Sequence, residues 1–484
     1  MSRTVDAPAG APTTATPVAP RRAPGLVVAL VAAPLLALLR WWQLHGRAPL
    51  SWQDTGDFAA TAEAPWASRA LWAGSRPPGV PVLLRLAGSD LSRYVALQAA
   101  LAVACWTALA ASVATVVRGR GRWVAAGAVV ALAATTPVTM WERSVLSESP
   151  AQSLLALTVA AGLQVARSPG RGAVAATVAV AAAWLAVRDS HAAVALGGGA
   201  AALGVAVAAA ARAHLAARRA VGTGAPAWAR PLAALGAAGL ALGALAMAGA
   251  AHGERHAFPT RNVYAVRILP YPERVEWFAD HGMPQAEHFL GPDRRAPHVE
   301  PGRAPVVAVA DDDPELGPWL RWVASEGRPA LLRYMATHPG YVLAEPFRSP
   351  ERAFNNAGGD RDFYAAPDTV RAPLVDRVLA LPSPLVLAAG ALLVGWGVGL
   401  GRWTPALVTG SVCVALAAVH GLVAWHGDGM ETARHLVVPV LQLRLGVLLL
   451  VVGLLPPAGP GTAGEGTSPA PASSEEGPAA QGSG

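Results

Sequence analysis

Apolar residues fall in long runs along most of the chain, and short polar stretches separate these runs. The runs lie at about 25–42, 93–117, 123–141, 149–166, 172–187, 191–211, 231–251, 382–401, 404–425 and 435–455. A helix that crosses a membrane needs roughly 17–25 apolar residues, and most of the runs reach that length. The pattern predicts an all-α polytopic transmembrane bundle of about ten spans.

The charge of the polar stretches alternates along the chain. Stretches that carry arginine but no acidic residue lie at 118–122, 167–171, 212–230 and 401–402, whereas every Asp and Glu between Asp54 and Glu431 lies in the other stretches. Cytoplasmic loops of membrane proteins are enriched in arginine and lysine. We therefore expect both termini in the cytoplasm and the acidic stretches outside it.

The runs divide the chain into parts with different roles. We expect a disordered cytoplasmic tail at 1–24, spans at 25–251 with a long first external loop at 43–92, an extracytoplasmic domain at 252–381, spans at 382–455 and a disordered cytoplasmic tail at 456–484. Helix start and stop signals in the extracytoplasmic domain predict mostly helices. Val263–Leu269 alternates weakly, as a strand does.

Composition supports a membrane protein and excludes other classes. Charged residues make up 14% of the chain, against about 25% in soluble domains. The net charge is +7, but the arginines lie in short clusters between apolar runs, which argues against a nucleic-acid partner. All basic residues are arginine, and with the excess of Ala, Gly and Pro this indicates a GC-rich bacterial genome and the bacterial plasma membrane. Cys105 and Cys413 lie inside apolar runs and indicate neither a disulfide nor a zinc site.

The first external loop carries two acidic residues, Asp54 and Asp57, three positions apart. A helix over Thr55–Ala64 would use Asp54 as its N-cap, which is an explanation without chemistry. Alternatively, two carboxylates just above a membrane serve as a general base or hold a divalent cation. Arg76-Pro-Pro then ends any helix and leads into an amphipathic stretch at Val80–Leu86.

An acidic loop after the first run, followed by Arg76-Pro-Pro-Gly-Val-Pro, resembles the GT-C-type membrane glycosyltransferases, such as the protein mannosyltransferases and the aminoarabinose transferases. Leu146-Ser-Glu-Ser-Pro and Glu431-Thr-Ala-Arg-His, which precede two later runs, extend the likeness over most of 25–455. The family often shows an acidic pair or Asp-x-Asp, whereas here the second Asp follows at i+3. This difference from the family pattern leaves open whether the loop binds a divalent cation.

The resemblance implies an inverting transferase that uses a polyprenyl-phosphate sugar as donor. The acceptor would be an extracytoplasmic hydroxyl on a protein, a lipid or a polysaccharide. The hydroxyl needs a base, and the departing phosphate needs positive charge. We assign Asp54 as the general base with Asp57 as a second catalytic carboxylate, Arg76, Arg434 and Arg444 to the donor phosphate, and Glu148, Arg143 and Arg188 to substrate binding.

Several charged residues keep a second interpretation. Arg444 lies near the middle of the last run, where an arginine costs roughly 2.5–3.5 kcal/mol; bonds to backbone carbonyls would explain it as well as a phosphate would. Arg188 and Asp189 fit a solvated pair on a turn as well as a substrate contact. The Asp311–Asp313 run fits a solvated helix start better than a calcium site.

Three other functions compete with sugar transfer. A transporter or flippase would show internal repeats and polar residues at mid-membrane, whereas this chain has no evident repeat and its acidic residues lie outside. A lipid-linked polysaccharide ligase or polymerase also needs a large external segment, but not an acidic first loop. A scaffold without catalysis would have no use for Asp54.

Overall fold

The protein is described here by a computed structural model that covers residues 23–117, 119–218, 226–290, 314–349, 353, 372–430 and 432–455. Every regular element in these ranges is a helix, and one isolated parallel bridge joins Leu50 to Ser144. The predicted all-α class is confirmed. The C-terminal tail, nearly all of the N-terminal tail, the Asp311–Asp313 run and Glu431 lie outside the described residues.

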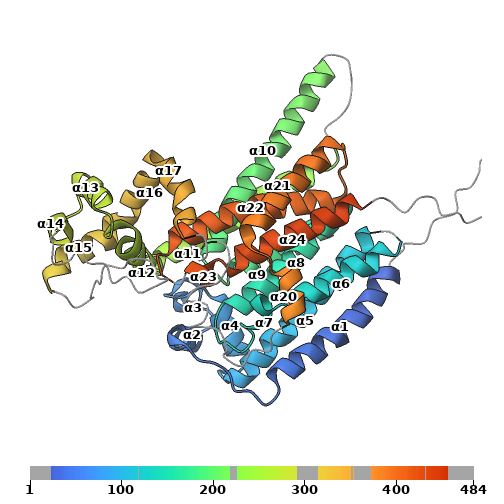
Figure 1. Cartoon of the computed structure of the whole chain (residues 1–484), viewed down its shortest axis with the longest axis horizontal. Coiled ribbons are helices and arrows are strands. Elements are labelled where there is room, and N and C mark those ends of the chain that lie inside the picture. Colours follow the sequence, from blue (N-terminus) through green and yellow to red (C-terminus); the bar gives the residue numbers. More distant parts are fainter. Residues whose placement is uncertain are drawn as a thin grey trace, which may run out of the picture.

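Long helices pack side by side into one bundle (Figure 1). They are α1 (Ala23–Leu44), α5 (Leu91–Val116), α6 (Gly121–Ala133), α8 (Glu148–Arg167), α9 (Arg171–Leu185), α10 (Ser190–Arg218), α11 (Ala229–His252), α21 (Ser383–Gly399), α22 (Pro405–Gly427) and α24 (Val437–Leu454). The most extensive contacts join α10 to α11, α22 to α24, and α5 to both α1 and α8. The chain therefore folds mostly by packing helices that are near neighbours in sequence.

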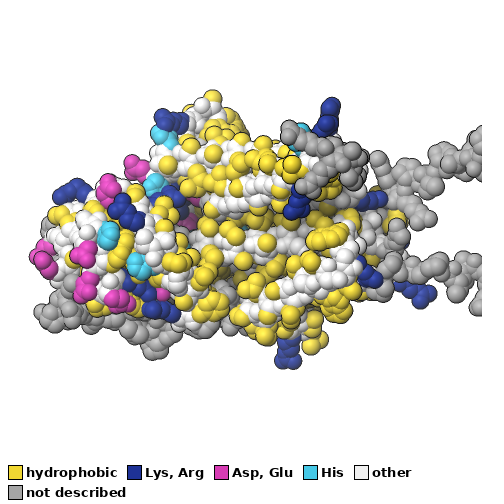
Figure 2. Space-filling view, turned by 90° about the horizontal axis from the view of Figure 1, so that it is seen from above, with side chains coloured by type: hydrophobic (Ala, Val, Ile, Leu, Met, Phe, Trp, Pro, Cys, Tyr) yellow, Lys and Arg dark blue, Asp and Glu magenta, His cyan; other side chains and the backbone are white. Residues whose placement is uncertain are grey.

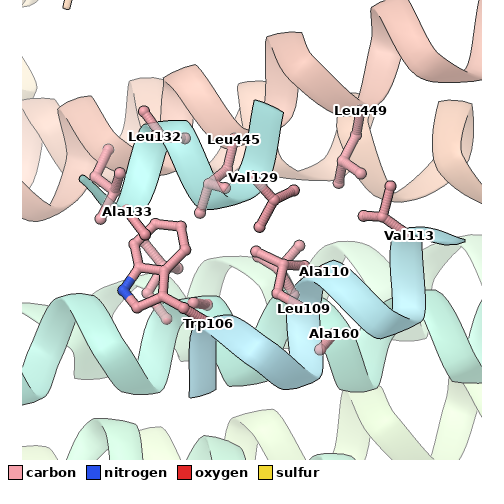
Figure 3. Packing of buried hydrophobic residues seen from close by; sticks show 14 of the residues in the cluster. Trp106, Leu109, Ala110, Val113, Val129, Leu132, Ala133, Ala160, Leu445 and Leu449 are labelled. Atoms are coloured by element: carbon pink, nitrogen blue, oxygen red, sulfur yellow. The ribbon is translucent and has the colours of Figure 1, made fainter. Parts of the chain in front are cut away.

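The core of the bundle lies where α5 meets α6, α8 and α24 (Figure 3). Trp106, Leu109 and Val113 lie about one turn apart on one face of α5 and are at most 1% exposed. Val129 of α6 and Leu445 of α24 approach the same face. Because lipid tails are as apolar as these side chains, close van der Waals packing holds such helices together.

The number of helices that can cross a membrane is smaller than predicted. In the described part of the chain, six stretches are long and apolar enough: α1, α5, α10, α11, α22 and Thr432–Leu454. A seventh arises if α20 (Pro373–Leu379) and α21, which bend by 47° at a short break, form one span. The structure is consistent with a multi-pass membrane protein, but the prediction of about ten spans is wrong.

The missing spans have physical reasons. Helices α6 and α9 contain 13 and 15 residues, which at 1.5 Å per residue do not reach across a hydrocarbon core of about 30 Å. The run at 123–141 stops early because the chain leaves the helix at Thr135 and starts α7 (Thr136–Thr139) with Pro137 in its first turn. Helix α8 is long enough but begins with a buried Glu148 and also carries Gln152, so its sequence is less apolar.

Two groups of short helices lie at one end of the bundle. The first loop forms α2 (Gln53–Glu63), α3 (Arg69–Ala73) and α4 (Gly79–Leu86). The second group comprises α12 (Ala257–Val263), α13 (Pro272–Asp280), α14 (Ala286–Leu290), α15 (Gly317–Trp322), α16 (Arg328–Thr337) and α17 (Pro339–Ala344). Figure 1 places both groups at the end opposite the start of α1 and the end of α24. On the face in Figure 2 the acidic side chains gather at that same end.

Two local predictions for these helices are wrong. Val263–Leu269 is helical: Tyr264–Ile268 forms a π-helical turn after α12, and all five of its side chains are buried instead of alternating, with Tyr264 and Ile268 in an aromatic core. Helix α2 starts at Gln53, so Trp52 is its N-cap and Asp54 lies inside the first turn. Thr55 Oγ1 accepts a hydrogen bond from the Trp52 backbone N–H at 2.9 Å. Capping therefore does not explain Asp54.

Candidate functional site

Two segments far apart in the sequence are joined at the acidic end of the bundle. The Leu50 backbone N–H donates to Arg143 O at 2.9 Å, and the Val145 N–H donates to Leu50 O at 3.0 Å. The Thr55 hydroxyl donates to Val145 O at 3.1 Å. These bonds fix the start of α2 against the loop at 142–147, which leads directly into α8.

The same loop is tied to the long helices behind it. The Tyr94 hydroxyl of α5 donates to Leu146 O at 3.0 Å, and the Gln98 side chain donates to Ser144 O at 3.3 Å. Arg40 of α1 forms an ion pair with Glu142 at 2.6 Å, with side chains only 3% and 2% exposed. The loop is thus held from two helices and presents Glu148 at the first position of α8.

Asp54 lies at the centre of a chain of alternating charges. Its Oδ1 contacts Arg76 Nη2 at 2.8 Å, and its Oδ2 contacts Arg434 Nη2 at 2.8 Å. Arg76 also contacts Asp57 Oδ2 at 2.5 Å. Arg434 Nε donates to Glu148 Oε1, again at 2.5 Å. We call these five residues the Asp54 cluster.

The cluster continues into the bundle through Arg188. The Arg188 guanidinium lies 3.5 Å from Glu148 Oε1 and bonds to His435 Nδ1. His435 Nε2 in turn contacts Asp428 Oδ2 at 3.1 Å, and Asp428 Oδ1 accepts from the Asn262 side-chain amide at 3.2 Å. The second group of short helices is therefore connected to the Asp54 cluster through polar side chains.

Exposure falls steadily from one side of the cluster to the other. The side chain of Asp57 is 57% exposed and that of Asp54 is 21% exposed, whereas that of Glu148 is fully buried. Asp57 and Asp54 are therefore accessible from solvent. Glu148 is shielded from solvent and contacts Arg434 and Arg188.

The charges around Asp54 set its protonation state. Burial by itself would raise the pKa of Asp54, but the positive charges of Arg434 and Arg76 outweigh it and lower the pKa below its usual value. The hydrogen bond from Arg434 acts in the same direction. An ion pair or hydrogen bond to the charged form favours that form, so the Asp54 carboxylate is ionised at neutral pH.

Six of the eight predicted site residues come together here, and two do not. The six are Asp54, Asp57, Arg76, Glu148, Arg188 and Arg434. Arg143 is turned back on the first loop, where it donates to Ala48 O at 2.9 Å. Arg444 donates to Leu381 O at 3.3 Å, at the break between α20 and α21. This agrees with the interpretation that Arg444 bonds to a backbone carbonyl.

The sequence did not point to every residue that builds the site. His435 belongs to the Glu431-Thr-Ala-Arg-His motif, but nothing in the sequence signals that Asp428 contacts it. A pair between Arg188 and Asp189 is one of the two interpretations that the sequence allows, but the Asp189 carboxylate faces Arg255 at 3.5 Å. The signal that the sequence offered for the site was the position of arginines next to the stretches predicted to be external. The fold decided which carboxylate each of these arginines meets.

Neither a metal site in the described residues nor a match to a known protein identifies the role of the Asp54 cluster. Among the residues that the structure describes, no group of three or more His, Cys, Asp or Glu side chains is placed to hold a metal ion. Comparison of the chain with models of known protein families found no match, and comparison with curated proteins found none either.

Proposed function

We propose that this protein is a membrane glycosyltransferase of the GT-C type, which moves a sugar from a polyprenyl-phosphate donor to an acceptor hydroxyl. The observation that supports it is the position of Asp54 between Arg76 and Arg434, at an end of the apolar helices. A lipid-linked sugar presents its phosphate at the level of the headgroups. The donor and a partly exposed carboxylate would therefore meet at the same depth.

The proposed reaction assigns a task to each part of the cluster. The acceptor oxygen forms a bond to the anomeric carbon as the carbon–oxygen bond to phosphate breaks, and Asp54 takes the hydroxyl proton. The phosphate leaves with the bonding electrons, and Arg76 and Arg434 stabilise its charge. Attack opposite the leaving group inverts the anomeric centre.

Donor binding would also prepare the base. In the free protein both oxygens of Asp54 contact an arginine, which keeps its pKa low and makes it a weak base. A phosphate that approaches Arg76 competes first with the exposed Asp57 carboxylate. As the arginines turn to the phosphate, the pKa of Asp54 rises and the carboxylate becomes a better proton acceptor.

The orientation in the membrane is part of the proposal. The stretches with arginine at 119–122 and 401–402 border the end of α5 and the start of α22, which lie away from the Asp54 cluster. By the positive-inside rule we propose that those ends and both termini lie on the cytoplasmic side of a bacterial plasma membrane. The cluster and the helices of 252–349 would then face outward, with that domain receiving the acceptor, whether protein, lipid or polysaccharide.

Transfer by the purified full chain tests the proposal. We would supply a panel of radiolabelled polyprenyl-phosphate hexoses and pentoses with envelope extracts as acceptor. Asp54→Asn is expected to lower the transfer rate by roughly 10²–10⁴-fold, the usual contribution of a positioned general base. Asp90→Asn is the matched control, because Asp90 caps α5 and Asn caps equally well. A full rate from Asp54→Asn would remove Asp54 from this role, and no transfer from any donor would reject the function.

One observation favours a flippase as the second candidate. Helices α20 and α21 meet at a 47° bend, and Arg444 bonds to a carbonyl at the break. Discontinuous helices that carry polar groups are typical of transporters. Movement of a fluorescent polyprenyl-phosphate sugar across proteoliposomes, without transfer to any acceptor, would support this alternative.

A further inference from the structure

The turn that carries Arg188 and Asp189 is fixed beside the segment that follows Arg76. The Gly79 backbone N–H, at the start of α4, donates to Ala186 O at 2.7 Å. A Cβ atom on Gly79 would lie 2.9 Å from that oxygen, so only glycine permits this close approach. The turn sends its two charged side chains apart, Arg188 to Glu148 and Asp189 to Arg255.

Arg255 is buried without the partners that a guanidinium needs. Its side chain is 5% exposed, and the Asp189 carboxylate lies 3.5 Å away. Its Nε and Nη1 atoms have no hydrogen-bond acceptor among the described residues. Arg76 and Arg434, by contrast, contact carboxylates at 2.5–2.8 Å. A buried charged donor without an acceptor destabilises a fold, so an arginine of this kind calls for an explanation.

Asp189 is also poorly suited to balance the charge of Arg255. Its side chain is 34% exposed, on a turn between two helices. Burial raises the pKa of Asp189, although Arg255, Arg328 and Arg188 each lower it. Burial also lowers the pKa of Arg255, and Asp189 offsets this only in part. Neither charge therefore compensates for the desolvation of the other.

Positive charge exceeds negative charge around this pair. Arg255, Arg328, Arg188 and Arg76 all act on the Asp189 carboxylate. Arg188 and Arg76 are already balanced by Glu148 and the acidic residues of α2. Arg255 and Arg328 both act on the Asp189 carboxylate, so two positive charges meet its single negative charge.

We propose that Arg255, supported by Arg328, forms an oxyanion-binding subsite for a phosphoryl group of a substrate, and that Asp189 occupies this subsite as a displaceable carboxylate when no ligand is bound. Guanidinium groups pair with the oxygens of phosphate through several charge-assisted hydrogen bonds. A loose carboxylate, one third exposed, is the group that an incoming oxyanion displaces most easily. The phosphoryl group would belong to a lipid carrier or to a water-soluble ligand.

Ligand-induced stabilisation of the full chain in detergent tests the subsite without any transfer reaction. The probes are inorganic phosphate and farnesyl phosphate, each titrated in phosphate-free buffer against sodium chloride of equal ionic strength. A ligand that binds the folded state raises the unfolding temperature according to its concentration and dissociation constant. Arg255→Gln should weaken phosphate binding by roughly tenfold to a hundredfold, the usual effect of a hydrogen bond to a charged group.

The second variant has the opposite expected sign. Asp189→Asn removes the competing carboxylate and should bring half-maximal stabilisation to a lower phosphate concentration. Arg321→Gln, on an exposed arginine of α15, should match the wild type. Arg255→Lys keeps the positive charge and replaces Arg255→Gln in the test if that variant does not fold. We expect Arg255→Lys to bind phosphate more weakly than the wild type.

The outcomes show whether the ligand is a lipid carrier or a water-soluble molecule. They also show whether the subsite exists. Arg255-dependent stabilisation by inorganic phosphate indicates a phosphoryl group of a water-soluble ligand, and stabilisation by farnesyl phosphate alone indicates a lipid carrier. An unchanged response of the Arg255 variants, a weaker response of Asp189→Asn, or no response of the wild type would each overturn the proposal. Sugar transfer that depends on Asp54 would stand in any of these cases.

Discussion

The pair formed by Arg434 and Glu148 should dominate the stability of the acidic end of the protein. Arg434 is 3% exposed and Glu148 is fully buried, and their atoms are 2.5 Å apart. Arg434 also contacts Asp54 at 2.8 Å, and Glu148 lies 3.5 Å from Arg188. Removal of either partner takes away the shortest ion pair of a buried charge and leaves that charge with its second partner only, Asp54 for Arg434 or Arg188 for Glu148. Arg434→Gln, Glu148→Gln and the double variant would test this pair.

The expected magnitude follows from the burial of both groups. Loss of one partner of a buried ion pair costs about 3–5 kcal/mol. We expect each single variant to fall in that range. The double variant should cost less than the sum of the two, with a coupling energy of about 0.5–3 kcal/mol, as found for residues in direct contact. Arg93→Gln, on an exposed arginine of α5, should change stability by no more than about 0.5 kcal/mol.

Unfolding from mixed micelles, followed by tryptophan fluorescence, measures these free energies in the full-length protein. The double-mutant cycle isolates the contact from the separate effects of the two substitutions. Single variants that lose less than about 1 kcal/mol would mean that water or lipid headgroups solvate these charges. Strict additivity in the double variant would mean that the two side chains do not interact. Either result would refute the buried network as described.

Two further predictions concern acid stability and the break between α20 and α21. Because the folded-state pKa of Asp54 is lowered, its stabilising effect is complete above the usual pKa of about 3.9 and is lost as the pH falls below it. The difference in unfolding temperature between wild type and Asp54→Asn should be constant above about pH 5 and shrink below about pH 4; a difference independent of pH would contradict this. Arg444→Leu should lower the free energy of unfolding by about 1–3 kcal/mol, because Leu381 O loses a charged donor. A stability equal to that of the wild type would show that the bond contributes nothing.

Several features of the site were predictable from the sequence. Acidic residues in the first loop, an arginine before two prolines, and charged residues at the entry to two later apolar runs were all local patterns. Each pattern places its residue at the end of a helix. Helix ends at the same side of a bundle are limited to a small area, so six of the predicted residues meet.

The pairing within that area was not predictable. Arg188 and Asp189 are adjacent in sequence, yet a tight turn held by Gly79 directs one to Glu148 and the other to Arg255. Arg143 and Arg444 have the same charge as the arginines of the cluster, but backbone carbonyls bind them instead. Such choices depend on distances between elements that are far apart in the chain.

The sequence alone determined the helical class, the membrane setting and the concentration of acidic residues between particular apolar runs, because hydrophobic periodicity and charge are local properties. The tertiary structure decided how many helices can span a membrane, since helix ends at Thr135 and the bend before α21 depend on packing. It also decided that Asp54 faces two arginines while Arg255 faces one loose carboxylate. Burial makes those differences matter, because a charge removed from water must find its partner within the fold.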